Sequence, residues 1–263
     1  MPEEKWALIL GASSGFGAAA AIRLAQAGFH IAGIHLDRRN TLPNAEKVIA
    51  EIQKSGKRAQ FFNLNAADAQ RRAEVIESCR NTIGGGTDGG IRTVLHSLAF
   101  GTLKPFVHQD PQKRIKQSDM NMTLDVMAHS FVYWIQDLLD ANLIGKGSKV
   151  FAMTSAGAHR IWPTYGAVSA AKSALEAHVR QLSVELAPMG ISVNAIQAGV
   201  TETPAARRIP GSDAMFSRAA ESNPGGKLTV PEDVAELITA LSLCESSWTT
   251  GNIIRVDGGE DLV

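Results

Sequence analysis

Short apolar runs alternate with segments of helical character along the whole chain, and this alternation limits the possible folds more than any other feature. The runs expected to be strands lie at 6–10, 29–36, 60–64, 91–95, 149–154, 191–196 and 253–256. Helices are expected between them at 18–27, 43–55, 68–82, 119–140, 166–186 and 231–243. Strands and helices that alternate in this way form a parallel sheet with helices on both faces. The sequence therefore predicts a doubly wound α/β fold.

The composition fits a single domain over 1–263, because 44% hydrophobic content in a chain of this length provides a large core. A formal net charge of zero gives no support for nucleic-acid or membrane-surface binding. Cys79 and Cys244 are too few for a disulfide framework, and the opening MPEEKWALIL lacks the order of a signal peptide. We therefore expect a cytoplasmic protein. The sequence also lacks a His, Cys and carboxylate group with metal-ligand spacing.

Polar and glycine-rich motifs follow the expected strands at their carboxyl ends, where ligands bind in sheets of this kind. The first motif, Gly11-Ala-Ser-Ser-Gly15-Phe-Gly17, lies between a strand and a helix. Glycines there permit a tight turn and the close approach of a pyrophosphate, which the helix N-terminus attracts. The spacing differs from the common G-x-G-x-x-G fingerprint, but its context favours a dinucleotide site.

A second motif is Tyr165-Gly-Ala-Val-Ser-Ala-Ala-Lys172, which falls in an expected helix. At about 100° per residue, seven steps come to about 700°, so Tyr165 and Lys172 project from one face. A phenol beside an ammonium suits proton donation to a developing oxyanion. The lysine charge is expected to lower the pKa of the phenol and to hold a cofactor ribose.

Together these motifs resemble the short-chain dehydrogenase/reductase superfamily over nearly the whole chain. The resemblance rests on the glycine loop, Asn121, Ser155, the Tyr165 and Lys172 helix, Val193-Asn-Ala195 and Val256-Asp-Gly-Gly259. It implies a Rossmann-type NAD(P)-binding domain, a homotetramer, and catalysis by Ser155, Tyr165, Lys172 and Asn121. From its position alone, Ser155 either assists the substrate oxygen or caps a turn. For Asn121, the sequence supports a structural role as much as a catalytic one.

One departure from the superfamily is informative. Most members place Tyr four residues before Lys, where this chain has Val168. The Tyr-x6-Lys spacing instead resembles enoyl-acyl-carrier-protein reductases, as do His96-Ser-Leu-Ala-Phe100 and Gln197-Ala-Gly-Val200. The compact glycine loop and the ending Asp257–Val263 resemble an NADPH-using branch of them, whereas Ala156 departs from the most widespread branch.

Chemistry gives a reason for the displaced tyrosine. In carbonyl reduction the hydride arrives at the carbonyl carbon, next to the oxygen that is protonated. In reduction of a 2-enoyl thioester the hydride arrives two carbons away, so the charge develops further from the nicotinamide. A donor one helical turn upstream, about 4.5 Å along the axis, meets that oxygen. The alternatives are a carbonyl reductase, such as a 3-oxoacyl reductase, and a non-catalytic NADP-binding protein.

The resemblance assigns cofactor contacts residue by residue. They fall on Gly11, Ser13, Ser14, Gly15, Phe16, Gly17, His35, Arg38, Arg39, Asn65, Ala66, Ser97, Leu98, Ala99, Tyr165, Lys172, Gly199, Val200, Thr201 and Thr203. His35 takes the place of the acid that would bind the ribose of NAD, Asp37 follows two positions later, and Arg38 and Arg39 would accommodate a 2′-phosphate. We therefore expect NADPH as the cofactor, with NADH less favoured.

The stretch 200–226 carries Pro204, Pro210 and Pro224 and is expected to be an irregular substrate lid. Its Arg207 and Arg208, with Arg218, would attract an acidic acyl carrier protein. The sequence leaves open whether an acyl carrier protein or coenzyme A carries the thioester substrate.

Overall fold

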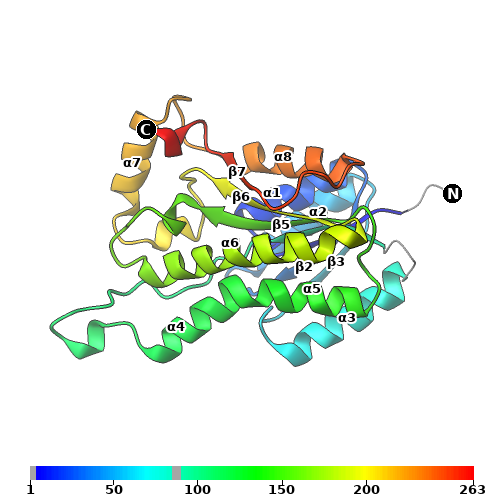
Figure 1. Cartoon of the computed structure of the whole chain (residues 1–263), viewed down its shortest axis with the longest axis horizontal. Helices are drawn as coiled ribbons and strands as arrows, with labels where there is room; N and C mark the ends of the chain where they lie inside the picture. Colours follow the sequence, from blue (N-terminus) through cyan, green and yellow to red (C-terminus); the bar gives the residue numbers. More distant parts are fainter. Residues whose placement is uncertain (1–3, 85–89) are drawn as a thin grey trace.

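The computed structural model describes residues 4–84 and 90–263, and a single parallel sheet forms its centre (Figure 1). The strands are β1 (Trp6–Leu10), β2 (His30–His35), β3 (Ala59–Asn63), β4 (Ile91–His96), β5 (Lys149–Ser155), β6 (Ser192–Ala198) and β7 (Ile253–Val256). They lie in the order β3-β2-β1-β4-β5-β6-β7, and every neighbouring pair is parallel. The strand order reverses between β1 and β4, which confirms the predicted doubly wound fold.

Helices cover both faces of the sheet. One face carries α1 (Gly15–Gln26), α2 (Leu42–Lys54) and α8 (Pro231–Leu243). The other carries α3 (Ala69–Ile83), α4 (Gln117–Leu124), α5 (Ser130–Asp140) and α6 (Gly166–Leu186). Successive strand residues point to opposite faces, so both layers need apolar partners and the strands read as continuous apolar runs. Among the described residues, none of the helices combines the length and apolarity needed to cross a membrane.

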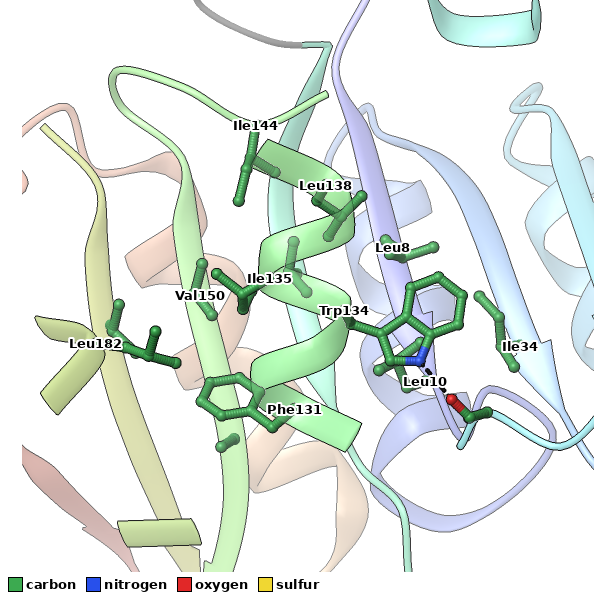
Figure 2. Packing of buried hydrophobic residues seen from close by; sticks show 14 of the residues in the cluster. Leu8, Leu10, Ile34, Phe131, Trp134, Ile135, Leu138, Ile144, Val150 and Leu182 are labelled. Atoms are coloured by element: carbon green, nitrogen blue, oxygen red, sulfur yellow. Dashed lines mark hydrogen bonds between the residues drawn. The ribbon is translucent and has the colours of Figure 1, made fainter. Parts of the chain in front are cut away.

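The inner face of α5 shows how a helix layer packs on the sheet (Figure 2). Phe131, Trp134, Ile135 and Leu138 follow helical spacing and are fully buried. Burying a side chain of this size contributes about 1.5–3 kcal/mol relative to exposure. The indole N–H of Trp134 donates to the carbonyl of Ala66 at 2.8 Å, which satisfies the one polar atom of this side chain.

The helix expected over 119–140 is interrupted. A π-helical turn, Asp125–His129, separates α4 from α5, and Ser130 Oγ donates to the carbonyl of Val126 at 2.8 Å. Such a turn inserts one extra residue, and the apolar pattern of the sequence did not reveal it.

The stretch 200–226 is more regular than predicted. It contains a 3₁₀ turn, Ala206–Arg208, and the helix α7 (Ser212–Ser222), so the prediction of an irregular segment was wrong there. Proline residues bracket the helix, but 212–222 itself has neither proline nor glycine. Gly211, with φ of 78°, provides the left-handed entry to α7.

Candidate active site

Ser155 and Tyr165 are brought together by a turn at the end of β5. Ser155 is the last residue of the strand, and the 3₁₀ turn Ala156–Ala158 follows it. A Cβ added at Gly157 would lie 2.6 Å from Tyr165 Cε1 and 3.1 Å from Ser155 Oγ. The phenol ring therefore rests on Gly157 beside the serine hydroxyl, in space that a side chain at 157 would fill.

Tyr165 is delivered to this position by a strained residue. Thr164 has φ of 64°, a left-handed conformation that is unfavourable for a β-branched side chain. Tyr165 is then the N-cap of α6. Backbone strain of this kind costs of the order of 1–3 kcal/mol and is concentrated at functional sites.

Lys172 lies two turns further along α6 and is buried. Its Nζ donates to the carbonyl of Met153, on β5, at 2.6 Å. Burial lowers the pKa of Lys172 to about 8, although the carboxylate of Glu176 acts in the opposite direction. The ammonium form therefore still predominates at neutral pH.

The pKa of Tyr165 differs from the sequence expectation. Burial raises it above the ordinary phenol value, and the nearby Ser155 hydroxyl lowers it only in part. The pKa of Tyr165 is thus raised where a lowered value was expected, because burial outweighs the hydrogen bond from Ser155. The phenol consequently keeps its proton at neutral pH, which is the form that can donate.

Ser155 itself offers a second donor. Its Oγ is buried and, within the part of the chain that the structure describes, makes no hydrogen bond of ordinary geometry. A buried hydroxyl without a partner is costly, which is a reason to expect that a ligand atom completes it.

Val168, which stands in the position of the superfamily's usual tyrosine, is turned into the core. It is 5% exposed, and a Cβ added at Gly101 would lie 2.7 Å from Val168 Cγ2 and 2.8 Å from Thr123 Cγ2. Position 168 therefore packs α6 against the segment after β4. The phenol of this helix is Tyr165.

Asn121 lies apart from these residues. It is exposed on α4 and lines a depression of about 370 Å³ with Met122, Leu124, Asp125 and His129. No described hydrogen bond joins it to Ser155, Tyr165 or Lys172, and its catalytic role stays a prediction.

The glycine loop and the segments after β4 and β6 converge as expected. Gly11, with φ of 92°, lies so close to the carbonyl of Ser97 that a Cβ would overlap it, and Leu98 Cδ2 is 3.6 Å from the same point. A Cβ at Gly17 would overlap the carbonyl of Gly11. A Cβ at Gly15 would lie 3.4 Å from Thr203 Cγ2.

The N-terminus of α1 faces the place where these loops meet, and its first backbone N–H groups have no partner within the helix. Ser14 is the N-cap but its side chain does not cap the helix, and the first turn carries no acidic residue. Helix N–H groups left without partners favour an anion. The loop and helix thus fit the pyrophosphate of a dinucleotide, and Phe16 packs behind them on the apolar cluster.

Asp37 is closer to this site than its sequence position suggested. Its Oδ2 lies 2.8 Å from Nδ1 of His35, which is buried at the end of β2. Burial would raise the pKa of Asp37, but hydrogen bonds from Thr41, from Ser13 of the glycine loop and from His35 outweigh burial and lower it. The carboxylate is therefore ionised beside the loop.

Arg38 and Arg39, by contrast, are exposed. Their side chains form no ion pair in the described structure. Their expected contact with a 2′-phosphate stays a prediction.

The remaining predicted contacts are distributed around the same edge. Asn65 is exposed and its Oδ1 accepts the N–H of Ala67 at 3.0 Å, while the carbonyl of Ala66 is occupied by Trp134. Ala99 is exposed. After β6, Thr201 and Thr203 are buried, and the N–H groups of Gly199 and Val200 donate to Val256 O and Glu260 Oε2.

His96 is buried where β4 ends. Its Nε2 lies 2.9 Å from Ser130 Oγ, and burial together with the charge of Lys172 lowers its pKa to about 3. This side chain packs inward, so a contact with a cofactor at this position would involve the backbone.

Comparison with known proteins agrees with this geometry. The family model described as Enoyl-(Acyl carrier protein) reductase matches residues 11–260. The uncharacterized oxidoreductase YjdA of Bacillus subtilis is 29% identical over 259 residues, covering 98% of this chain and 97% of YjdA. The enoyl-[acyl-carrier-protein] reductase [NADH] FabI of Aquifex aeolicus is 27% identical over 241 residues, covering 89% and 84%.

A solved dehydrogenase/reductase from Sinorhizobium meliloti superposes with a TM-score of 0.81 at 27% identity, covering 97% of this chain and 94% of that one. Fold, motifs and relatives thus agree along nearly the full length of the chain. The chain belongs to the enoyl-(acyl carrier protein) reductase-like family of the short-chain dehydrogenase/reductase superfamily, and it is an oxidoreductase of the kind that uses NAD(H) or NADP(H).

Proposed function

We propose that the protein reduces the carbon–carbon double bond of a trans-2-enoyl thioester, as an enoyl-acyl-carrier-protein reductase of fatty-acid synthesis does. The observation that carries the proposal is the position of the phenol. Tyr165 lies on the serine turn one helical turn upstream of Val168, whose side chain is buried in the core. A bound nicotinamide cofactor supplies the hydride for this chemistry.

The residues of the chain have distinct roles in this proposal. Tyr165, protonated because burial raises its pKa, donates to the thioester oxygen on which charge develops. Ser155 Oγ, buried beside the ring, donates to the same oxygen. Lys172, held by the carbonyl of Met153 and charged at neutral pH, binds the hydroxyls of the cofactor ribose.

The carrier of the acyl group and the assembly of the protein are further proposals. The segment 200–226 would close over the substrate, because Trp162, near Tyr165, donates to the carbonyl of Pro210 in that segment. Arg208 and Arg218 are exposed there and would attract an acidic acyl carrier protein, whereas Arg207 already pairs with Glu202. The superfamily resemblance supports a homotetramer.

Ser155 also favours a second candidate, a carbonyl reductase acting on a 3-oxoacyl thioester or another ketone. A serine and a tyrosine that share one oxygen suit a carbonyl as well as an enolate. The experiment is to measure cofactor oxidation by the purified protein with crotonyl and longer 2-enoyl thioesters, beside acetoacetyl thioesters. We expect the enoyl substrates to give the higher kcat/KM, and rapid turnover of ketones alone would refute the proposal.

The preferred nucleotide is a separate proposal. The sequence expectation of NADPH rests on His35 in place of an acid and on Arg38 and Arg39, which are exposed. The ionised carboxylate of Asp37, however, lies beside Ser13. An acid in that region accepts the ribose 2′-hydroxyl of NADH and repels a 2′-phosphate. We therefore propose NADH as the preferred cofactor, in place of NADPH.

Replacing Asp37 with Asn tests this choice. The amide keeps the shape and removes the charge, so we expect the ratio of kcat/KM for NADPH to that for NADH to rise by about 10-fold or more, which corresponds to about 1.4 kcal/mol. Steady-state rates with both nucleotides give the ratio, and Asp140→Asn, an exposed acid on α5, is the control. If wild-type protein already uses NADPH better, Asp37 does not select the nucleotide.

A further inference from the structure

Two neighbouring carboxylates after β7 connect to two loops of the predicted site, the serine turn after β5 and the segment after β6. Glu260 and Asp261 belong to a 3₁₀ turn, Glu260–Leu262. The side chain of Asp261 is only 3% exposed, and that of Glu260 is also buried. Acids are rarely buried without paired donors, so their partners show what the turn does.

Asp261 holds the turn that begins at Ser155. His159 Nε2 lies 3.0 Å from both oxygens of the carboxylate, and Arg160 Nε lies 2.9 Å from Oδ1. The N–H groups of His159 and Arg160 close that turn on the carbonyl of Ala156 at 3.0 and 2.7 Å. The carboxylate thus fixes the far side of the turn on which the Tyr165 ring rests.

The same carboxylate is anchored to the sheet. Gln197 Nε2 donates to Oδ2 at 3.0 Å, and Arg255 lies 3.2 Å from that oxygen. Gln197 and Arg255 are direct partners on β6 and β7, and Gln197 also pairs with Thr154 on β5. Asp261 therefore ties the serine turn to β6 and β7.

Donors from the serine turn, β6 and β7 face this carboxylate, while the carboxylates of Asp257 and Glu260 lie near it on its own segment. Burial would raise the pKa of Asp261, but hydrogen bonds from Gln197 and His159 and the charge of Arg160 lower it. Asp261 is therefore ionised, and an amide at this position would direct an N–H₂ group at these donors.

Glu260 holds the other loop. Its Oε2 accepts the N–H of Val200 at 2.9 Å, and a Cβ at Gly199 would lie 2.9 Å from the same oxygen. Gly199 and Val200 belong to the predicted cofactor segment after β6. The residues that Asp261 binds on the serine turn lie outside this segment, so the two acids hold different loops.

We propose that Asp261 is a positioning residue for the proton donor, and that Glu260 is the corresponding positioning residue for the cofactor loop. Asp261 acts through His159, Arg160 and Gly157 on Tyr165, and Glu260 acts through Val200. The proposal rests on the proposed function for its kinetic readout only, because two further readouts do not require turnover.

The experiment compares Asp261→Asn with Glu260→Ala in the full chain, with Glu260→Gln as the conservative variant that retains an acceptor for Val200. Three quantities are measured: kcat, the Kd for NADH from nicotinamide fluorescence, and the NMR signal of ring-labelled tyrosine. The chain has two tyrosines, Tyr133 and Tyr165, so Tyr165→Phe assigns both signals. Asp140→Asn is again the control, and melting temperatures are recorded for all variants.

For Asp261→Asn we expect kcat to fall at least 10-fold and the Tyr165 signal to shift, with the Tyr133 signal in place and Kd within 2-fold. For Glu260→Ala we expect Kd to rise at least 5-fold with the Tyr165 signal in place, and Glu260→Gln should restore Kd. If Asp261→Asn does not fold, the double variant His159→Ala and Arg160→Ala removes the same link from its more exposed side.

Two outcomes would overturn the proposal. One is an unmoved Tyr165 signal in Asp261→Asn. The other is a shift of both tyrosine signals together with a change of Kd in Asp261→Asn and in Glu260→Ala alike. That result would mean that the turn at 260–262 supports the whole fold and positions neither loop in particular. If wild-type protein reduces no enoyl thioester, the proposed function fails, but the NMR and Kd measurements still decide whether the two acids position the two loops.

Discussion

Tyr165→Phe is expected to lower kcat for a 2-enoyl thioester by about 10²–10³-fold, the usual cost of losing one donor to a developing oxyanion. The variant keeps the ring that rests on Gly157 and removes only the hydroxyl beside Ser155. Cofactor affinity should change little, because Lys172 keeps its own hydrogen bond to Met153. The measurement is the rate of nicotinamide oxidation at saturating substrate.

Tyr133→Phe is the matched control, since Tyr133 is the other tyrosine of the chain and lies on α5 against Arg72. Its activity should equal that of the wild type. Unchanged turnover in Tyr165→Phe would remove the proton donor from both the enoyl and the ketone mechanisms, and a non-catalytic protein would then become the better interpretation.

Gly11→Ala is expected to destabilise the fold by about 2–5 kcal/mol and to abolish nucleotide binding. Two effects add. A φ of 92° is unfavourable for alanine by about 1–2 kcal/mol. The new Cβ also overlaps the carbonyl of Ser97, and overpacking of this kind destabilises a fold by about 1–3 kcal/mol. Chemical denaturation measures the free energy of unfolding, and nicotinamide fluorescence measures binding.

Gly28→Ala separates these two effects. Gly28 also has a left-handed φ, of 104°, but a Cβ there would meet no atom within 4 Å among the described residues. Its cost should therefore be limited to about 1–2 kcal/mol of backbone strain, with nucleotide binding intact. Equal destabilisation by the two variants would mean that the contact between the glycine loop and Ser97 is looser than the structure indicates.

The strands and most helices could be predicted because burial of the sheet on both faces gives continuous apolar runs in the strands and an apolar stripe on the helices. Every strand was placed within two residues, and α6 and α8 were placed at their observed bounds. The π turn at Asp125–His129 was missed because one inserted residue barely changes an apolar pattern. The helix α7 was not predicted because the prolines that flank it favour irregular structure, although 212–222 itself contains no helix breaker.

The site was predictable where the fold itself determines geometry. Segments at the carboxyl ends of parallel strands must meet, and Gly11, Ser97 and Thr203 do so. The side-chain directions were not predictable. Counting from the glycine loop placed His35 in the acid's position, but it could not show that the side chain of Asp37 folds back onto it.

The contacts of Glu260 and Asp261 could not be predicted from the sequence either. The closing Asp257–Val263 carried a family resemblance, but nothing in its composition indicates which distant residues its acids bind. Arg160 lies about one hundred residues from Asp261, and the side-by-side pairing of β5, β6 and β7 in the sheet brings them together. A single sequence contains no direct signal for such a pairing.

Asp261 binds Gln197 on β6 and Arg255 on the edge strand β7, as well as His159 and Arg160 of the serine turn. The geometry of the proton donor therefore depends on how the last strand is seated on the sheet. Loosening of the β7 edge is expected to reach Tyr165 through this one carboxylate.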